Sequence, residues 1–202
     1  RTSASEMDGD LDQSLVIEEN GSVGSENPAY SESTPTISLT SSNGSFSLTN
    51  QCVISGDRPG GTEIRGVVID TRVSGGTGDI NILSETGKVY GLIYAKNDGT
   101  GQIDITTGLV ELSSVSSSQN NAAITVRTGN TTADVSLRTT DKVMAYDARY
   151  NMSQTAIDIK NQGVGKTQHT IEGNIIGARA IKVDHSTDGT LNITHASGTN
   201  DT

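Results

Sequence analysis

The side chains that could carry out chemistry are few in this sequence, and their spacing does not converge on one reaction. Asp184, His185 and Ser186 are consecutive, but successive side chains of a strand point to opposite faces, so these three cannot form a catalytic triad. His169 and His195 are too scattered along the chain to indicate a metal site with His185. We expect all three histidines to lie at the surface, and we expect no catalytic residues.

Two short motifs resemble ligand-binding sequences without completing them. Residues 165–167 (GKT) match the end of a phosphate-binding loop, but Lys160 stands where the first glycine of that motif belongs. Residues 75–79 (GGTGD) approach the calcium-binding nonapeptide, with Asp79 one position early and no tandem copy. We therefore expect neither a cofactor nor a metal ion.

Carboxylates alternate with apolar residues in several segments. Asp104, Glu111, Asp158 and Glu172 are expected to point outward. Glycan-cleaving proteins built of stacked β-strands place carboxylates in an outer groove, so a glycan-degrading enzyme is the alternative. Alternating charge is also what a solvated face of any such protein carries, and we predict that the chain is not an enzyme.

Composition narrows the class of protein. The 202 residues carry 24 acidic and 14 basic side chains, for a net charge of −10, which disfavours nucleic acid and anionic membranes as partners. No apolar run is long enough to span a membrane. Cys52 is the only cysteine, so a disulfide framework is excluded. We expect Cys52 to point into the core as a small apolar residue.

Residues 91–106 show most clearly which secondary-structure elements position these side chains. Ile93 and Ala95 lie on one side of the first run, with Leu92 and Tyr94 on the other. After the turn 96–101, Ile103 and Ile105 alternate with polar residues. Alternation with a period of two predicts half-buried strands, and the Gly- and Asn-containing turn separates them. The segment is therefore predicted to be a strand, a tight turn and a second strand.

This unit recurs along the chain, with successive copies starting 24 to 33 residues apart, which indicates a repeat architecture. Hydrophobic residues make up only 32% of the chain and aromatic residues 3%, so a narrow core of stacked aliphatic side chains is favoured over a sandwich. We predict an all-β fold, a right-handed parallel β-helix or solenoid. Its inward side chains are expected to form apolar ladders, with Ile82, Ile105, Leu137, Ile159 and Ile193 as candidate members.

The chain is predicted to have two parts. Residues 1–35 are acidic and form a leader or cap, partly disordered, in which only 15–17 is expected to be a strand. Residues 36–202 form the repeat domain, as a fragment of a longer array. The turn at 42–44 contains Asn-Gly and predicts an antiparallel hairpin between its flanking strands.

Three units carry a resemblance to a known family: 78–82 (GDINI), 91–95 (GLIYA) and 101–106 (GQIDIT). With the Thr-, Asn- and Gly-rich composition and the near-absence of cysteine, they resemble passenger domains of bacterial autotransporters, over about residues 64–194. The resemblance implies a secreted or cell-surface virulence factor, exported through a C-terminal β-barrel in the outer membrane. Since the sequence contains neither signal peptide nor barrel, both are expected to have been removed.

The expected partner is a host cell-surface protein or receptor, or extracellular matrix. Tyr146 and Tyr150 are the predicted binding residues, because exposed tyrosine is common at protein-binding surfaces. The loops 113–121 and 142–154 interrupt the repeats and are the predicted binding segments. The protein is expected to act as an adhesin or as a soluble receptor ligand. The resemblance extends to passengers that mimic growth factors. A self-associating stalk is a further alternative.

Overall fold

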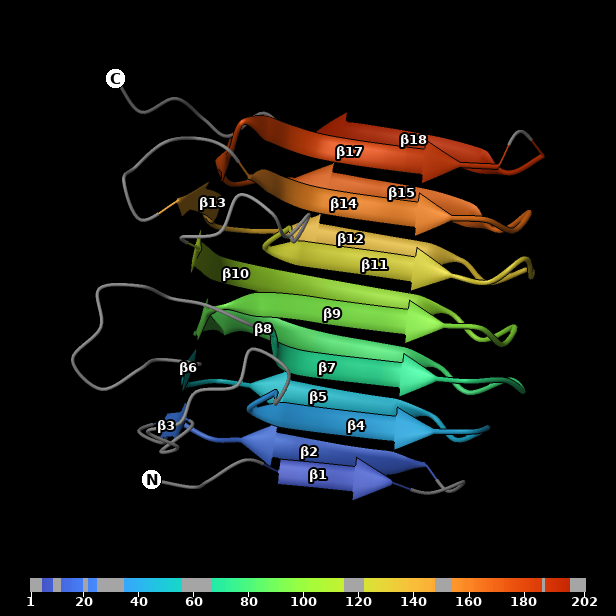
Figure 1. Ribbon diagram of the computed structural model, residues 1–202, viewed down its shortest axis with the longest axis horizontal. Helices are drawn as coiled ribbons and strands as arrows, with labels where there is room; N and C mark the ends of the chain where they lie inside the picture. Colours follow the sequence, from blue (N-terminus) through green and yellow to red (C-terminus); the bar gives the residue numbers. More distant parts are fainter. Residues whose placement is uncertain are drawn as a thin grey trace.

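The computed structural model describes residues 5–8, 12–19, 22–24, 35–55, 67–114, 122–147, 154–186 and 188–196. Every regular element in these ranges is a β-strand. The strands form one sheet of seven strands and one of eleven, and the described strand pairs are parallel. This confirms the prediction of an all-β chain, with parallel strands in two sheets (Figure 1).

The seven-stranded sheet has the spatial order β1 (Ser5–Asp8), β4 (Ile37–Ser41), β7 (Val67–Val73), β9 (Leu92–Asn97), β11 (Ile124–Thr128), β14 (Thr155–Asn161) and β17 (Arg179–His185). The main path of the eleven-stranded sheet is β2 (Gln13–Ile17), β5 (Phe46–Asn50), β8 (Ile80–Tyr90), β10 (Ile103–Ser114), β12 (Val135–Thr139), β15 (Lys166–Ile171) and β18 (Thr190–His195). Four further strands of this sheet lie off the main path. β6 (Val53–Ser55) pairs with β8 and with β3 (Ser22–Gly24), and β13 (Val143–Asp147) pairs with β10 and with β16 (Ile175–Ile176).

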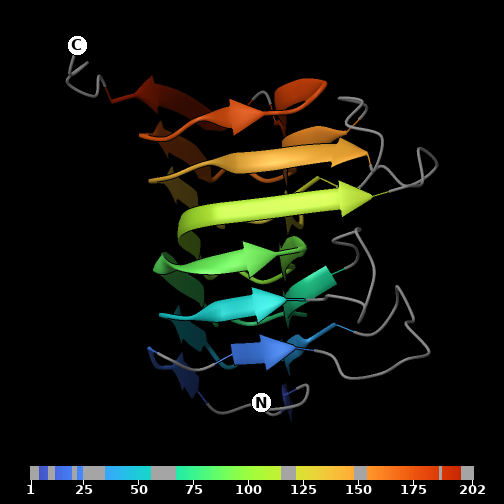
Figure 2. The same cartoon turned by 90° about the vertical axis from the view of Figure 1, so that its left-hand side faces the viewer.

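The chain visits the two sheets alternately, so that a strand of the first sheet and the strand or strands of the second that follow it make one layer. Successive layers stack directly on one another (Figures 1 and 2). Ile69 pairs with Ile37, 32 residues earlier, and with Ile93, 24 residues later. Ile124 pairs with Ile157, 33 residues later. The registers therefore match the predicted spacing of the repeats.

The core lies between the two sheets and consists mainly of aliphatic side chains, with Phe46 and Cys52 among them, and most of these residues are less than 3% exposed. Fully burying one such side chain contributes about 1.5–3 kcal/mol. One inward ladder of the eleven-stranded sheet consists of Leu48, Ile82, Ile105, Leu137, His169 and Ile193.

Four of the five predicted ladder residues lie in this ladder. The fifth, Ile159, is buried in an apolar ladder of the seven-stranded sheet, between Val126 and Val183. His169 was not predicted as a ladder residue, because β15 has polar residues at its inward positions Thr167 and His169 and lacks the apolar alternation of the other strands.

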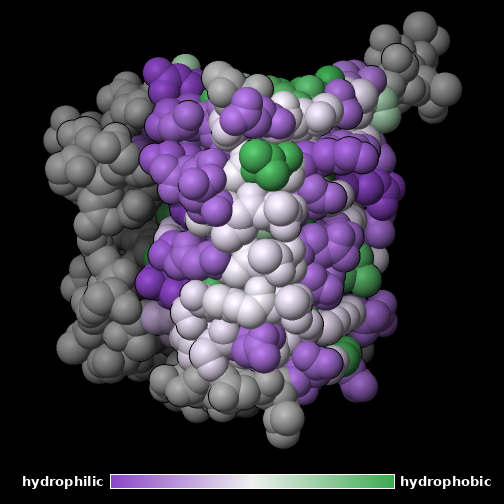
Figure 3. Space-filling view, turned by 90° about the vertical axis from the view of Figure 1, so that its right-hand side faces the viewer, coloured by the Kyte–Doolittle hydropathy of each residue, from purple (hydrophilic) through white to green (hydrophobic). Residues whose placement is uncertain are grey.

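Buried asparagines at strand ends hold the turns that join the two sheets. The Asn97 side-chain amide donates to the carbonyl oxygens of Gly78 (2.9 Å) and Gly101 (3.0 Å), and its oxygen accepts from the Gly99 amide (2.8 Å). Asn161 occupies the matching position two layers on and bonds the Gly163 amide (3.2 Å). This side of the molecule shows a pale column of intermediate hydropathy between hydrophilic flanks (Figure 3).

The predicted hairpin around residues 42–44 is wrong. β4 and β5 lie in different sheets and pair with other layers, all in parallel. The Ser41 hydroxyl oxygen accepts hydrogen bonds from the backbone amides of Asn43 (3.1 Å) and Gly44 (2.7 Å). These bonds stabilise the turn in which the chain crosses from the first sheet to the second.

The acidic segment holds more regular structure than predicted. Three strands, β1, β2 and β3, pair in parallel with β4, β5 and β6, where only 15–17 was expected to be a strand. An edge strand needs only backbone N–H and C=O groups to join a sheet, which explains why apolar patterning missed β1 and β3. The division of the chain at residue 35 stays a prediction.

Candidate functional site

Four side chains gather where β8, β10 and β13 end, and we call them the tyrosine edge: Tyr90, Glu111, Met144 and Tyr146. Glu111 pairs in register with Tyr90 in the layer below and with Met144 in the layer above. Neighbouring strands lie about 4.8 Å apart, so the three form a continuous column. All four residues of the edge are half-buried.

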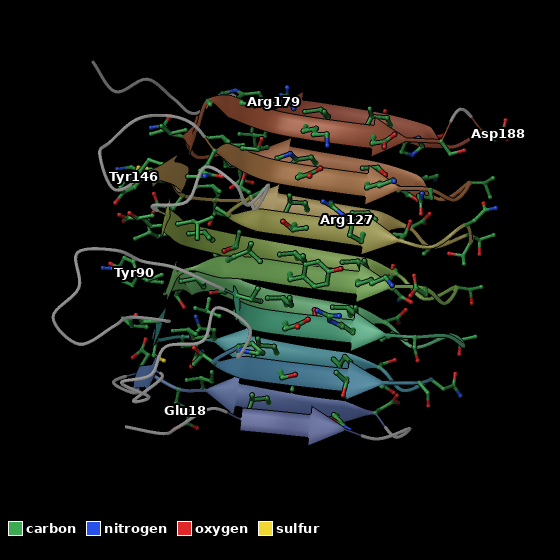
Figure 4. The ribbon with its side chains drawn as sticks, viewed as in Figure 1. Glu18, Tyr90, Arg127, Tyr146, Arg179 and Asp188 are labelled. Carbon is green, nitrogen blue, oxygen red and sulfur yellow. The ribbon has the colours of Figure 1, made fainter. Side chains whose placement is uncertain are left out.

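Tyr146 is tied to this column by a hydrogen bond. Its phenolic hydroxyl donates to a carboxylate oxygen of Glu111, 35 residues earlier in the chain. Tyr146 itself pairs in register with Ser113. Tyr90 and Tyr146 lie on the same side of the molecule, one above the other (Figure 4). The hydrogen bond orients the Tyr146 ring before any partner arrives.

The predicted tyrosines do not all meet at this edge. Tyr150 lies outside the described residues, as do 115–121 and 148–153 of the two predicted binding loops. The expectation of a loop is wrong for 143–147, which form strand β13 and pair with β10. Tyr94 lies on the outer face of the seven-stranded sheet, where the Arg72 guanidinium stands 4.9 Å from its ring centre. Sequence reasoning missed Glu111 as a companion of Tyr146, because only the strand register brings residues 35 positions apart together.

The outer face of the seven-stranded sheet carries a cationic column: Arg72, Lys96, Arg127 and Lys160 occupy successive register positions. Three of the four charges are paired with carboxylates, Arg72 with Asp70 at 2.8 Å, Lys96 with Asp98 at 2.6 Å and Arg127 with Asp158 at 2.8 Å. Arg127 lies near the middle of this face (Figure 4). The column is therefore largely neutralised and does not form a site for a polyanion.

Asp158 points to the outer face of the seven-stranded sheet, as expected, in register with Thr125 and Lys182, but it is not solvated. Its side chain is only 9% exposed, because Arg127 lies against it and Lys182 approaches to 3.7 Å. One carboxylate oxygen bonds the Arg127 guanidinium, which also donates to the Asp158 backbone carbonyl (3.0 Å). The side chain is held by this network and is not available to a ligand.

The other predicted outward carboxylates are separate from one another. Glu172 bonds Arg138 (2.7 Å) on the eleven-stranded sheet, and this hydrogen bond lowers the pKa of its carboxyl group. Glu111 accepts from Tyr146. Asp104 alone lines a shallow depression of about 280 Å³ on the outer face of the eleven-stranded sheet. The depression is lined by Ser47, Thr49, Asn81, Ile82, Leu83, Asp104 and Thr106.

The three histidines do not share one environment. His169 is fully buried, so the expectation of a surface position is wrong for this residue. Burial lowers the pKa of its imidazole to about 4. His185 is half-buried and His195 is exposed. Among the described residues, no group of three His, Cys, Asp or Glu side chains is arranged to hold a metal ion.

Cys52 lies in the core, as predicted, and burial raises the pKa of its thiol. A thiol in this environment stays protonated at neutral pH, which makes it a poor nucleophile. Its Sγ atom contacts the carbonyl oxygen of Val53 at 3.6 Å. Its role in the described structure is packing.

No family model matches the chain, and comparisons with curated proteins and with solved structures find no significant similarity. In the part of the chain that the structure describes, no helix is long and apolar enough to cross a membrane. The site is therefore judged on its own geometry. The tyrosine edge joins two aromatic side chains, a methionine and an oriented carboxylate on one side of the stack.

Proposed function

We propose that the chain is a right-handed parallel β-helix, a passenger domain of the bacterial autotransporter class that is secreted or displayed on the cell surface. The parallel layers, the repeat of 24 to 33 residues and the narrow aliphatic core support the architecture. The resemblance of residues 78–106 to such passengers supports the class.

In this proposal the protein works by binding a host cell-surface protein, and the tyrosine edge is the observation that carries the proposal. Tyrosine and methionine are enriched at protein interfaces, where tyrosine combines a large apolar ring with a polar tip. Glu111 holds Tyr146 in one orientation, so less side-chain freedom is lost when a partner binds. Because Tyr90 and Tyr146 are only half-buried, part of each side chain stays exposed for contact with a partner.

Two modes of action fit a surface of this kind. As an adhesin, the protein would hold cells to host tissue only when it is anchored or multivalent. As a soluble ligand, for example one that mimics a growth factor, it would trigger receptor signalling as the purified chain. Adding the purified chain to host cells and measuring receptor phosphorylation separates the two modes.

The glycan-degrading alternative is less well supported by the described side chains. Hydrolysis of a glycosidic bond generally requires two carboxyl groups that flank the bond. Of the four outward carboxylates considered, Glu111, Asp158 and Glu172 are each bonded to another side chain, and Asp104 stands alone in its depression. This arrangement favours binding over hydrolysis.

A pull-down of host-cell surface proteins with the purified chain, followed by mass spectrometry, tests the proposed function. We expect one receptor ectodomain or matrix protein to be enriched. The double variant Tyr90→Ala/Met144→Ala should lose that protein, while Leu83→Ala, which removes an exposed side chain from the depression that contains Asp104, should retain it. Equal capture by both variants would refute the role of the tyrosine edge.

A further inference from the structure

The outer face of the eleven-stranded sheet is nearly neutral, although the whole chain has a net charge of −10. Two columns of outward side chains run along the main path of this sheet, one through Asn81 and the other through Leu83. In the described strands, Asp104 and Arg138 are the only charged members of these columns. Arg138 is paired with two glutamates, at 2.7 Å and 3.3 Å. Asp104 therefore carries the one charge of the two columns that no described residue neutralises.

The depression around this carboxylate, which we call the Asp104 depression, gathers polar side chains from three successive layers. Asn81 lies in register between Ser47 and Asp104, and two threonines flank Leu83 in the same way. In the part of the chain that the structure describes, none of these five polar side chains forms a hydrogen bond with another residue. Their donors and acceptors are therefore available to a ligand.

Leu83 adds an apolar side chain to the middle layer of the depression, where it is 48% exposed. It belongs to β8, which pairs with β5 on one side and with β10 on the other at this point. The backbone N–H and C=O groups of β8 are thus engaged in the sheet, so a peptide cannot bind here as an added strand. A ligand of this depression must be recognised through side chains.

We infer that the Asp104 depression binds a neutral glycan. Sugar hydroxyls both donate and accept hydrogen bonds, and they match the hydroxyl and carboxamide groups of the depression and the acceptor oxygens of Asp104. The apolar C–H face of a sugar ring packs on Leu83 and removes exposed apolar surface from water. The volume of about 280 Å³ is close to the lower end of the range for ligand sites, about 300 Å³, and therefore suits a mono- or disaccharide.

The charge of the depression restricts the class of glycan. Asp104 has Asn81 and Ser136 as its register neighbours, so no cation stands beside it in its column. An anionic sugar or a phosphate group would face this carboxylate and be repelled. The described lining has no aromatic ring on which a nucleobase could stack. A single carboxylate also fits binding without hydrolysis, which generally requires two.

Titration of the isotope-labelled full chain with neutral disaccharides, followed by proton–nitrogen NMR, tests this inference. The probes are maltose, cellobiose and N,N′-diacetylchitobiose. At least one of them should shift amide signals of β5, β8 and β10 and leave those of β14 and β17 in place, with saturation in the millimolar range, since a shallow, solvent-exposed site binds weakly. Digalacturonic acid, an anionic probe of similar size, should cause no such shifts.

Asn81→Ala should weaken binding of the active probe at least about fivefold, the loss expected for one hydrogen bond. Tyr90→Ala/Met144→Ala should bind the same probe as the unmodified chain does, which separates this site from the tyrosine edge. Millimolar binding at one site does not hold the chain to a cell, so Leu83→Ala stays a valid control for capture of a host protein.

Three results would overturn the inference. The first is the absence of shifts in β5, β8 and β10 with all three neutral probes. The second is equal affinity of Asn81→Ala and the unmodified chain for the active probe. The third is binding of digalacturonic acid at these strands with an affinity equal to or higher than that of the neutral sugars.

Discussion

His169 stands one layer above Leu137 in the same inward ladder, paired with it in parallel register, and both side chains are buried. The imidazole Nε2 atom lies 3.3 Å from the Thr139 hydroxyl oxygen, its one hydrogen-bond contact among the described residues. A core position that is aliphatic in the layers below therefore holds a titratable ring, which desolvation keeps neutral.

The first prediction concerns the pH dependence of stability. The pKa of His169 falls from 6.5 in the unfolded chain to about 4 in the fold, so the unfolded chain binds more protons between these values. The contribution of this group is fully present above pH 6.5 and is lost as the pH falls towards 4, at a cost of about 2–3 kcal/mol in the free energy of unfolding. Urea denaturation at pH 7 and at pH 4.5 measures it.

Carboxylates also titrate at low pH, so the control for this prediction is His169→Leu. This variant places an aliphatic side chain between Leu137 and Ile193 and removes the titrating group. Its free energy of unfolding should vary less between pH 6.5 and pH 4.5 than that of the unmodified chain. An unchanged acid sensitivity would show that His169 is not its source.

The second prediction concerns the turn that Asn97 holds. Asn97→Ala removes three hydrogen bonds and leaves the Gly78 carbonyl, the Gly101 carbonyl and the Gly99 amide without this partner. The free energy of unfolding should fall by about 2–4 kcal/mol, since unsatisfied buried polar groups are costly. Asn81→Ala, at a half-exposed outward position, should change it by less than about 0.5 kcal/mol. Equal effects of the two substitutions would contradict this account of the turn.

The third prediction concerns close packing between turns of successive layers. A Cβ atom at Gly101 would lie 2.0 Å from the carbonyl oxygen of Gly78, whereas one at Gly75 would meet nothing closer than 3.5 Å. Gly101→Ala should therefore force adjacent turns apart and lower the melting temperature. Gly75→Ala should leave it within a few degrees of the unmodified chain. Thermal unfolding followed by circular dichroism distinguishes the two, and a tolerated Gly101→Ala would count against the stacked turns.

The fourth prediction compares two arginines of different burial. Arg127→Ala leaves the Asp158 carboxylate, 9% exposed, with only the more distant Lys182 amino group. We expect a loss of about 3 kcal/mol, the lower end of the range for breaking a buried pair. Arg138→Ala breaks solvent-exposed pairs with Glu172 and Glu85 and should have a clearly smaller effect, because exposed ion pairs contribute little. A larger loss of stability for Arg138→Ala than for Arg127→Ala would contradict the burial of the Arg127–Asp158 pair.

Local alternation predicted much of the fold, because it depends on neighbouring residues. Ile103 and Ile105 point inward and Asp104 points outward, as expected. What alternation could not predict is which sheet a strand joins, since that depends on whether a turn crosses the stack. Ile159 and His169 belong to ladders of different sheets for this reason, and the inward position of His169 was not predicted.

The candidate site was predictable only in part, for a related reason. Tyr146 was selected as an aromatic residue outside the clearest repeats, and it does lie at the tyrosine edge. Tyr90 and Tyr94 are close in sequence, yet they lie on different sheets because the chain turns a corner between them. Long-range register, which no single segment encodes, brings Glu111 and Met144 to the site.

The central proposal is that the tyrosine edge binds a host cell-surface molecule. The most direct test is the binding of labelled protein to host cells, measured as a function of concentration for the unmodified chain, Tyr90→Ala/Met144→Ala and Leu83→Ala. We expect saturable binding that the double variant weakens at least roughly 30-fold, as for the loss of interface hot spots, and that Leu83→Ala leaves unchanged. Saturable binding of equal affinity for all three proteins would contradict the proposal.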